Sequence, residues 1–159
     1  MITARVLTIS DSCHAGTRVD ESGPAVQQRL ETAGFQVETV EVLPDERAAI
    51  AARLRELADT GAANVVFTTG GTGVALRDVT PEATADVIER PVPGLGERMR
   101  AEGLKHTPLA ALSRGISGTR GRTLIVNLPG SPKGAVESLD AILKLVPHMV
   151  RLLEGYTGH

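Results

Sequence analysis

The sequence is poor in aromatic residues and in cysteine, and both scarcities exclude classes of function. Tryptophan is absent, and aromatic residues make up only 2% of the 159 residues. Proteins that bind single-stranded nucleic acid stack the bases on aromatic side chains, so this chain lacks the usual platform. The lone Cys13 has no partner for an internal disulfide and no metal-ligand spacing around it, which favours a reducing, cytoplasmic setting.

The sequence also lacks a strong excess of one charge and lacks long apolar runs. Seventeen basic and 19 acidic residues give a net charge of -2, so the basic footprint of a nucleic-acid-binding protein is missing. No segment has the roughly 18 consecutive apolar residues that a membrane span requires. The first ten residues, MITARVLTIS, do not have the pattern of a signal peptide. We therefore expect no nucleic-acid partner and no membrane association.

The apolar and charged contents, 42% and 23%, are typical of a globular protein. The length fits one domain, residues 1–159. Short apolar runs alternate with segments of helical periodicity, which predicts an α/β fold with a mostly parallel sheet covered by helices on both faces. Near the C-terminal third, residues 116–117 and 122–128 flank GTRG and predict a short antiparallel pairing.

Four loops follow the predicted strands, after Ser10, Leu43, Thr69 and Leu128. In an open parallel sheet the carboxyl ends of the strands lie at one edge, and ligands bind there where the strand order reverses. These loops contain most of the unusual residues of the chain. The sequence thus predicts a binding site at this edge.

The loop after Thr69 lies in TTGGTGVALRDVTPEAT, residues 68–84, and joins a strand to a helix that begins near Thr80 and Pro81. It matches neither a Walker loop nor the G-x-G-x-x-G pattern. Glycine backbones allow N–H groups to approach an anion closely, and the following helix start favours negative charge. The same glycines also suit a tight turn with positive φ. The pattern leaves both interpretations open.

Two carboxylates accompany these loops. Asp78 follows the glycine turn, where it would repel a phosphate unless a cation lies between them, and Mg²⁺ is the natural cation because it prefers oxygen ligands. Asp45 lies on the loop after Leu43. The simpler alternatives are an ion pair between Asp78 and Arg77, and capping of the next helix by Asp45.

The last of the four loops, NLPGSPKG, places Asn127, a helix start at Ser131 and the cation of Lys133 at the same edge, although it could also be only a proline-rich turn. Ser10 closes the first strand, and Ser113 precedes the antiparallel pair beside Arg114, where such a pair is more often part of the surface. Cys13 and His14 lack a third orienting group, so a cysteine hydrolase is not indicated.

Taken in order, the segments TISDS, LPDE, TTGGTGVALRDVTPEAT, LSR and NLPGSPKG resemble the molybdopterin-binding domain family of molybdenum cofactor biosynthesis, in its single-domain Mog/MoaB-type branch. The resemblance covers nearly the whole chain. It implies a three-layer α/β/α fold, a homotrimer and a pocket for molybdopterin, a pterin with a dithiolene and a terminal phosphate. A partner protein that inserts molybdate is a further implied partner.

Active members of this family transfer AMP from Mg-ATP to the phosphate of molybdopterin, which yields adenylyl-molybdopterin and pyrophosphate. The resemblance therefore implies an adenylyltransferase, and the alternative is a non-catalytic molybdopterin carrier of the MoaB type. It assigns catalysis and Mg²⁺ binding to Asp45 and Asp78. It assigns substrate binding to Ser10, Thr69, Gly70, Gly71, Thr72, Gly73, Ser113, Asn127, Pro129, Ser131 and Lys133.

Overall fold

The computed structural model describes residues 1–158, and His159, the last residue of the predicted domain, lies outside the described residues. The strands are β1 (Thr3–Ile9), β2 (Gln36–Val37), β3 (Glu41–Leu43), β4 (Val65–Thr69), β5 (Arg90–Pro91), β6 (Ser117–Arg120) and β7 (Thr123–Leu128). The helices are α1 (Asp11–His14), α2 (Ser22–Thr32), α3 (Arg47–Asp59), α4 (Thr80–Ala85), α5 (Pro93–Gly103), the 3₁₀ helix η1 (Pro108–Leu112), α6 (Pro132–Ile142) and α7 (Val146–Leu153). Among the described residues, no helix has the length and apolar character needed to span a membrane.

The strands form one sheet in the order β2-β1-β4-β7-β6-β5, and β3 pairs with β1 beyond the end of β2. The pairings among β1, β2, β3, β4 and β7 are parallel, whereas β6 pairs antiparallel with β7 and β5 pairs antiparallel with β6. The predicted antiparallel pairing at GTRG is therefore confirmed as β6 and β7. The two-residue strand β5 is an addition that the sequence pattern does not predict.

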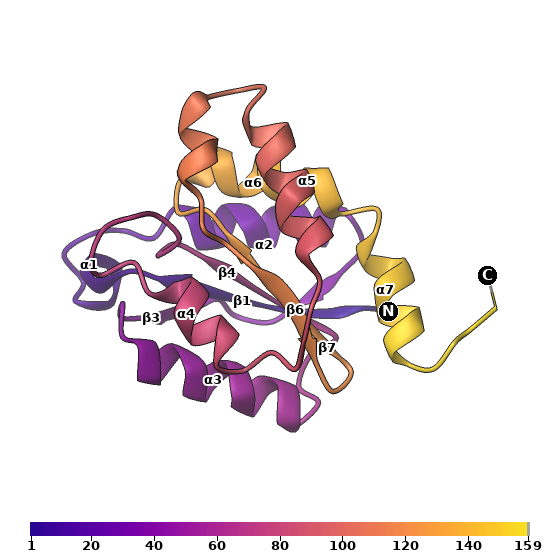
Figure 1. The fold of residues 1–159 in the computed structure, drawn as a ribbon. Helices are drawn as coiled ribbons and strands as arrows, with labels where there is room; N and C mark the ends of the chain where they lie inside the picture. Colours follow the sequence, from indigo (N-terminus) through magenta and orange to yellow (C-terminus); the bar gives the residue numbers. More distant parts are fainter. Residues whose placement is uncertain (159) are drawn as a thin grey trace.

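Helices cover both faces of this sheet, as Figure 1 shows: α2, α5 and α6 lie over one face, and α3 and α4 over the other. Successive side chains of a strand point to opposite faces, and β4 uses both. Val65 and Phe67 pack in the core that contains α2 and α6, while Val66 packs in the core that contains α3 and α4. The three-layer α/β/α sandwich is confirmed.

The strand order places a reversal point between β1 and β4. From β1 the chain moves to β2 and β3 on one side, and then returns to β4 on the other side of β1. The carboxyl ends of β1, β3, β4 and β7 lie at the same edge because these strands are parallel. The four loops that the sequence analysis singled out therefore meet there, as predicted.

Local structure differs from the sequence prediction at the start of α3 and agrees with it at the starts of α4 and α6. Helix α3 begins at Arg47 without a side-chain cap, so the alternative interpretation of Asp45 as its cap is wrong. Helix α4 begins at Thr80 with Pro81 in its first turn, as predicted. Ser131 caps α6, since its hydroxyl accepts a hydrogen bond from the N–H of Gly134. The carboxylate of Asp45 is therefore not used in a helix cap, whereas the hydroxyl of Ser131 is.

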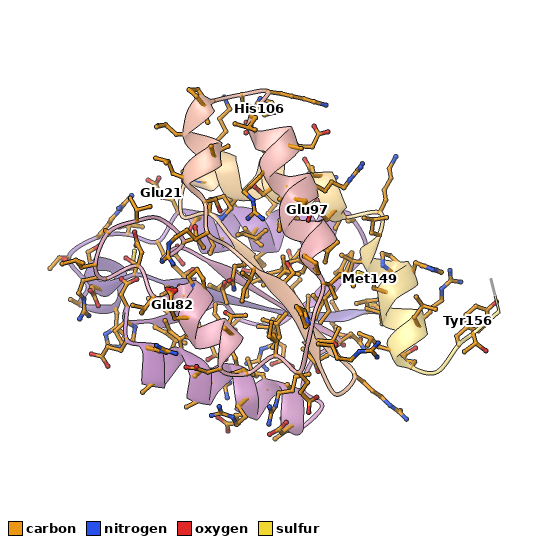
Figure 2. All side chains as sticks on the ribbon, viewed as in Figure 1. Glu21, Glu82, Glu97, His106, Met149 and Tyr156 are labelled. Carbon is orange, nitrogen blue, oxygen red and sulfur yellow. The ribbon has the colours of Figure 1, made fainter. Side chains whose placement is uncertain are left out.

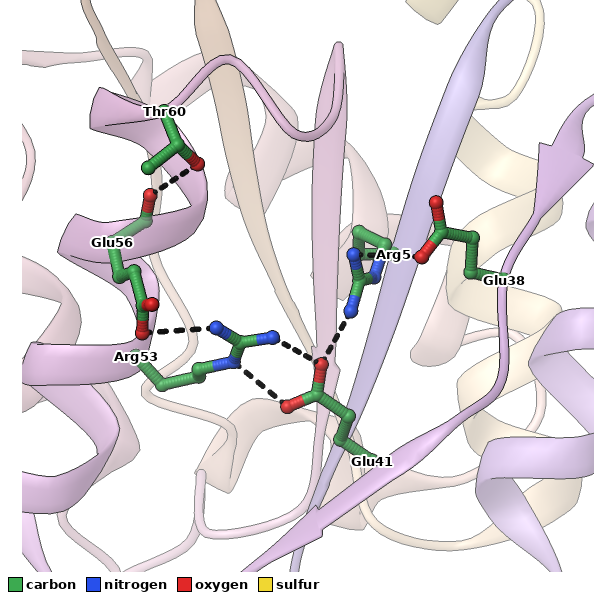
Figure 3. Close-up of polar contacts among 6 residues, drawn as sticks. All are labelled: Arg5, Glu38, Glu41, Arg53, Glu56 and Thr60. Atoms are coloured by element: carbon green, nitrogen blue, oxygen red, sulfur yellow. Dashed lines mark hydrogen bonds and ion pairs between the residues drawn. The ribbon is translucent and has the colours of Figure 1, made fainter.

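An ion-pair network ties β1 and β3 to α3, on the part of the molecule drawn in Figure 3. The carboxylate of Glu41 on β3 accepts hydrogen bonds from Arg53 of α3 at 2.6 and 2.8 Å and also from Arg5 of β1. Arg5 pairs in addition with Glu38, and Arg53 with Glu56. Hydrogen bonds from Arg53 are the main reason that the pKa of Glu41 is lowered.

We predict that Glu41→Gln lowers the free energy of unfolding by about 1–2 kcal/mol, because it weakens hydrogen bonds to a charged group that solvent partly screens. Since the folded-state pKa of Glu41 lies below its unfolded value, its contribution is present at neutral pH and is lost as the pH falls through the folded-state pKa. The difference between wild type and variant should therefore shrink in acid. Urea unfolding at several pH values measures it, and Glu56→Gln, at an exposed partner, is a control expected to change stability by less than about 0.5 kcal/mol.

Candidate active site

The glycine turn after β4 brings three loops into direct contact. Gly70 and Gly71 have φ values of 104° and 69°, a conformation that strains other residues. A Cβ atom on Gly70 would collide with the carbonyl oxygen of Ile9 at the end of β1. A Cβ on Gly71 would collide with the hydroxyl of Thr80 and lie 3.2 Å from Oδ1 of Asp45. Glycine is required here because the backbone of this turn touches both the first loop and Asp45.

The loop after β7 closes the site from the other side. The hydroxyl of Thr69 donates a hydrogen bond of 2.7 Å to the carbonyl of Pro129, and a Cβ on Gly130 would lie 3.2 Å from Cα of Gly70. The hydroxyl of Thr80 donates to the carbonyl of Gly70 at 2.9 Å. Thr80 therefore fixes the turn onto the start of α4.

Two cavities open at this edge. Cavity 1, of about 450 Å³, lies between the glycine turn, the α5–η1 hairpin and α6, and cavity 2, of about 360 Å³, lies between the end of β1, the segment before α2 and the loop of Asp45. Both cavities share a wall formed by residues from the glycine turn and the loop after β7: Gly71, Asp78, Gly130 and Ser131. We call these four residues the shared wall. Two ligands bound in the two cavities would therefore meet at this wall.

The glycine turn carries hydrogen-bond donors that are unpaired in the described part of the chain, on residues that line this space. Within residues 1–158, no group accepts a hydrogen bond from the N–H groups of Gly71, Thr72 or Gly73. All three residues line cavity 1, and Gly71 lines cavity 2 as well. Free N–H groups on a turn that leads into a helix suit an anion such as a phosphate. The tight turn with positive φ is present at Gly70 and Gly71, and the same turn carries the unpaired N–H groups that an anion-binding turn requires.

Asp78 belongs to the shared wall, and its carboxylate folds back on its own loop. Oδ2 accepts a hydrogen bond from the N–H of Ala75 at 3.0 Å, while Oδ1 has no hydrogen-bond partner among the described residues. Arg77 does not pair with it. The alternative interpretation of Asp78 as the ion-pair partner of Arg77 is therefore wrong.

Arg77 instead pairs with Asp11, and through Asp11 it is connected to Asp45. Its guanidinium donates to both carboxylate oxygens of Asp11, at 2.8 and 2.9 Å. Asp11 and Asp45 exchange two hydrogen bonds of 2.9 Å, since each carboxylate accepts from the backbone N–H of the other residue. The loops after β1, β3 and β4 are thus joined by one polar chain.

The environment of Asp45 disfavours its negative charge. Burial is the largest cause of its raised pKa, and the charges of Asp11 and Asp78 add to it. Oδ2 is occupied by the N–H of Asp11, and Oδ1 faces Gly71 without a hydrogen-bond partner among the described residues. A cation between Asp45 and Asp78 would relieve this repulsion.

The donor set fits Mg²⁺ that is shared with a substrate. Asp45 and Asp78 both line cavity 2, and each has one uncommitted carboxylate oxygen in the described part of the chain. No group of three or more His, Cys, Asp or Glu side chains that could hold a metal occurs among residues 1–158. Mg²⁺ is commonly held by one or two carboxylates together with substrate phosphates and water, so two aspartates are sufficient.

Arg114 holds the glycine turn in place, a role that the sequence analysis missed. Its guanidinium donates to the carbonyls of Gly73 and Asp78 at 2.8 and 2.7 Å, and to both carboxylate oxygens of Glu82 at 2.8 and 3.1 Å. Its own N–H donates to the carbonyl of Thr72. Figure 2 shows Glu82 on α4 beneath this loop. Apart from its place in LSR, no sequence signal marks Arg114, because its partners on the turn are backbone carbonyls 36 and 41 residues away.

The structure brings most of the predicted substrate-binding residues to the two cavities. Thr72, Gly73, Ser113, Asn127 and Pro129 line cavity 1, while Ser10, Thr69 and Gly70 line cavity 2. The side chain of Asn127 is fully used within the fold, since its amide donates to Thr68 and Thr84 and its oxygen accepts from Ile116. Lys133 is 84% exposed and lines neither cavity, so the structure does not place it with the others.

Comparisons with known proteins agree with this geometry. The model of a family described as "Probable molybdopterin binding domain" matches residues 5–148. A crystal structure of the molybdopterin biosynthesis enzyme MoaB from Thermus thermophilus superposes with a TM-score of 0.90 and 50% identity, covering 98% of each chain.

Two curated relatives are also similar. The Molybdopterin adenylyltransferase of Helicobacter pylori strain J99 is 42% identical over 94% of this chain and 86% of its own length. The Molybdenum cofactor synthesis protein cinnamon of Drosophila melanogaster is 44% identical over 96% of this chain, which spans only 26% of that longer protein. With the family match and the shared fold, these similarities show that the chain belongs to the molybdopterin-binding domain family of molybdenum cofactor biosynthesis.

Proposed function

We propose that the protein transfers AMP from Mg-ATP to the terminal phosphate of molybdopterin, which yields adenylyl-molybdopterin and pyrophosphate. The observation that carries this proposal is the pair of cavities with a shared wall of Gly71, Asp78, Gly130 and Ser131. A reaction between two phosphate-bearing substrates needs two neighbouring pockets whose reacting ends meet at anion-binding groups. The bacterial relative named as a molybdopterin adenylyltransferase supports the same reaction.

In this reaction the phosphate of molybdopterin is the nucleophile. Its oxygen forms a bond with the α-phosphorus of ATP, the bond between that phosphorus and the bridging oxygen to the β-phosphate breaks, and pyrophosphate leaves. The protein needs no covalent intermediate, and its residues act by alignment and by binding of negative charge. The free N–H groups of Gly71, Thr72 and Gly73 are the donors that we assign to the reacting phosphates.

Asp45 and Asp78 are the residues that would hold Mg²⁺, each through its uncommitted oxygen. When bound, the cation would neutralise negative charge on the phosphates. Asp11 and Arg77 fix the loop of Asp45, and Arg114 fixes the turn of Asp78. The two carboxylates are thus held by separate sets of contacts.

Other features of the proposed function come from the family resemblance: a single domain, a homotrimer, a cytoplasmic location and a partner protein that inserts molybdate. The alternative function is a non-catalytic molybdopterin carrier of the MoaB type. The observation that favours this alternative is the 50% identity to a MoaB structure. However, that MoaB protein is itself named as an enzyme, and this chain has both Asp45 and Asp78. We therefore rank the adenylyltransferase first.

We predict that the wild type releases pyrophosphate only when both Mg-ATP and molybdopterin are present. Asp78→Asn should lower kcat by about 100-fold or more, because a group that aligns or neutralises the reacting phosphates is lost, while molybdopterin binding is retained. A coupled pyrophosphate assay and a binding titration measure the two effects. Glu31→Gln, on the exposed face of α2, is the matched control and should keep wild-type rates.

Molybdopterin binding by a wild type that releases no pyrophosphate at saturating substrates would support the carrier instead. An Asp78→Asn variant with wild-type kcat would contradict the role given to this residue even if the reaction itself is observed.

A second prediction separates stability from activity at Asp45. Because the folded-state pKa of Asp45 is raised, its ionised form opposes folding at neutral pH, and this cost disappears as the pH falls below the unfolded-state pKa. Asp45→Asn should therefore unfold at the same temperature as wild type or higher, while its adenylyl transfer is strongly reduced. Thermal denaturation at pH 7 together with the pyrophosphate assay checks both, and a destabilised variant would indicate a structural role.

A third prediction concerns Arg114. Arg114→Lys retains the charge but cannot reproduce the planar set of contacts to Gly73, Asp78 and Glu82. We expect kcat to fall by roughly 10- to 100-fold, since misplacement of the turn by about 1 Å costs alignment of the phosphates. Arg98→Lys on α5, whose guanidinium donates to the carbonyl of Ala141 away from both cavities, is the control. An unchanged kcat in Arg114→Lys would show that the turn keeps its geometry without this residue.

A further inference from the structure

Cavity 1 contains an acidic side chain that the reaction at the shared wall does not use. Glu137 lies on α6 and lines this cavity together with Met99 of α5 and with Leu109 and Leu112 of η1. Leu109 and Leu112 are 69% and 51% exposed, so this part of the cavity offers apolar surface to a ligand. Figure 1 shows α5 and the 3₁₀ helix that follows it beside α6, and residues of all three elements line this cavity. A carboxylate among such residues can select between flat heterocycles.

The neighbours of Glu137 leave much of its carboxylate free. Lys133 and Nδ1 of His106 each approach it to 3.7 Å, which is too long for a hydrogen bond. Both approach the same atom, Oε1, and in residues 1–158 no group donates a hydrogen bond to either oxygen. Figure 2 places His106 at the turn between α5 and η1. The carboxylate is therefore available to a ligand.

Glu137 is also well separated from the shared wall. Ser131 caps α6 and belongs to that wall, and Glu137 lies six positions further along the same helix. At a rise of 1.5 Å per residue this corresponds to about 9 Å along the helix axis. A ligand with its phosphate at the shared wall and its ring system about 9 Å away along α6 would bring that ring near Glu137.

We infer that Glu137 is a specificity-determining residue that binds the pyrimidine edge of the pterin of molybdopterin, an inference that rests on the proposed function. A pterin presents two adjacent donors on this edge, the ring N3–H and the 2-amino group. A carboxylate accepts only, and its two oxygens match two parallel donors. Adenine presents a donor beside an acceptor, so the same carboxylate would meet a lone pair on one side.

This assignment gives each cavity a substrate. The pterin occupies cavity 1 between the α5–η1 hairpin and α6, and its phosphate arm reaches Gly71 and Ser131. Cavity 2, with Asp45, is then left for the nucleotide and its cation. The acceptor-only carboxylate disfavours adenine at the end of cavity 1 that contains Glu137.

The first test uses the complete reaction. In the pyrophosphate assay, Glu137→Gln should raise the KM for molybdopterin about 10- to 100-fold, the equivalent of losing one hydrogen bond to a charged group, with little change in kcat or in the KM for ATP. Glu97→Gln, an exposed residue of α5 seen in Figure 2, is the control and should match wild type. An unchanged KM for molybdopterin, or a raised KM for ATP in its place, would overturn the inference.

The second test needs no turnover. Fluorescence titration compares pterin with lumazine, which carries a carbonyl in place of the 2-amino group. The wild type should bind pterin at least about 10-fold more tightly. Glu137→Gln should prefer lumazine, because a carboxamide provides one acceptor and one donor and so matches N3–H beside C2=O. Equal affinity of the wild type for both rings, or no binding of either at millimolar concentration, would contradict the inference.

The two tests also separate this inference from the proposed function. Ring selectivity that reverses in Glu137→Gln, in a protein without adenylyl transfer, would support the role of Glu137 and reject the adenylyltransferase. Adenylyl transfer that is unaffected by Glu137→Gln would support the adenylyltransferase and reject the role of Glu137. Thermal denaturation of Glu137→Gln should match wild type, because Lys133 and His106 are exposed and lie 3.7 Å from the carboxylate, and contacts of this kind add little stability.

Discussion

The close approach of glycine backbones at the carboxyl edge of the sheet is the constraint on which the site depends. Gly70 packs against the end of β1 and against Gly130, and Gly71 packs against Thr80 and Asp45. A single methyl group at Gly70 or Gly71 would force these loops apart. Because they meet without side chains between them, the unpaired N–H groups of the turn and the two aspartates line two adjoining cavities. The sheet supplies this arrangement by placing the reversal of strand order between β1 and β4.

A second consequence of this packing is electrostatic. Asp45 is brought close to Asp11 and Asp78, and its pKa is raised by burial and by both neighbouring charges. Arg77 offsets part of this repulsion through Asp11, while Arg114 contacts Asp78 only through its carbonyl. The carboxylate of Asp78 accepts no hydrogen bond from a basic side chain in the described part of the chain, although the charge of Arg114 interacts with it. Two acidic side chains beside unpaired N–H groups suit a site in which a cation and phosphates bind between them.

The sequence was sufficient to predict the layers, the parallel sheet and the edge where the loops meet, because strand and helix periodicities and the turn residues Gly, Pro and Ser act locally. Helix starts at Thr80 and Ser131 were predictable for the same reason. The ion-pair and hydrogen-bond partners of the charged side chains could not be predicted from the sequence. Arg77 pairs with Asp11, which is 66 positions away, although Asp78 is adjacent, and Asp45 pairs with the loop after β1 although a helix begins two positions later. Lys133 follows the cap of α6 but points to solvent, so proximity in a motif did not place it in a cavity.

The central claim is that two substrates react across the shared wall, and the fate of the α-phosphate of ATP tests it most directly. With ATP labelled by ³²P at the α-position, Mg²⁺ and molybdopterin, the account predicts a labelled product in which AMP is attached to molybdopterin, formed in equal amount with pyrophosphate. Binding of both substrates without transfer of the label to molybdopterin would contradict it.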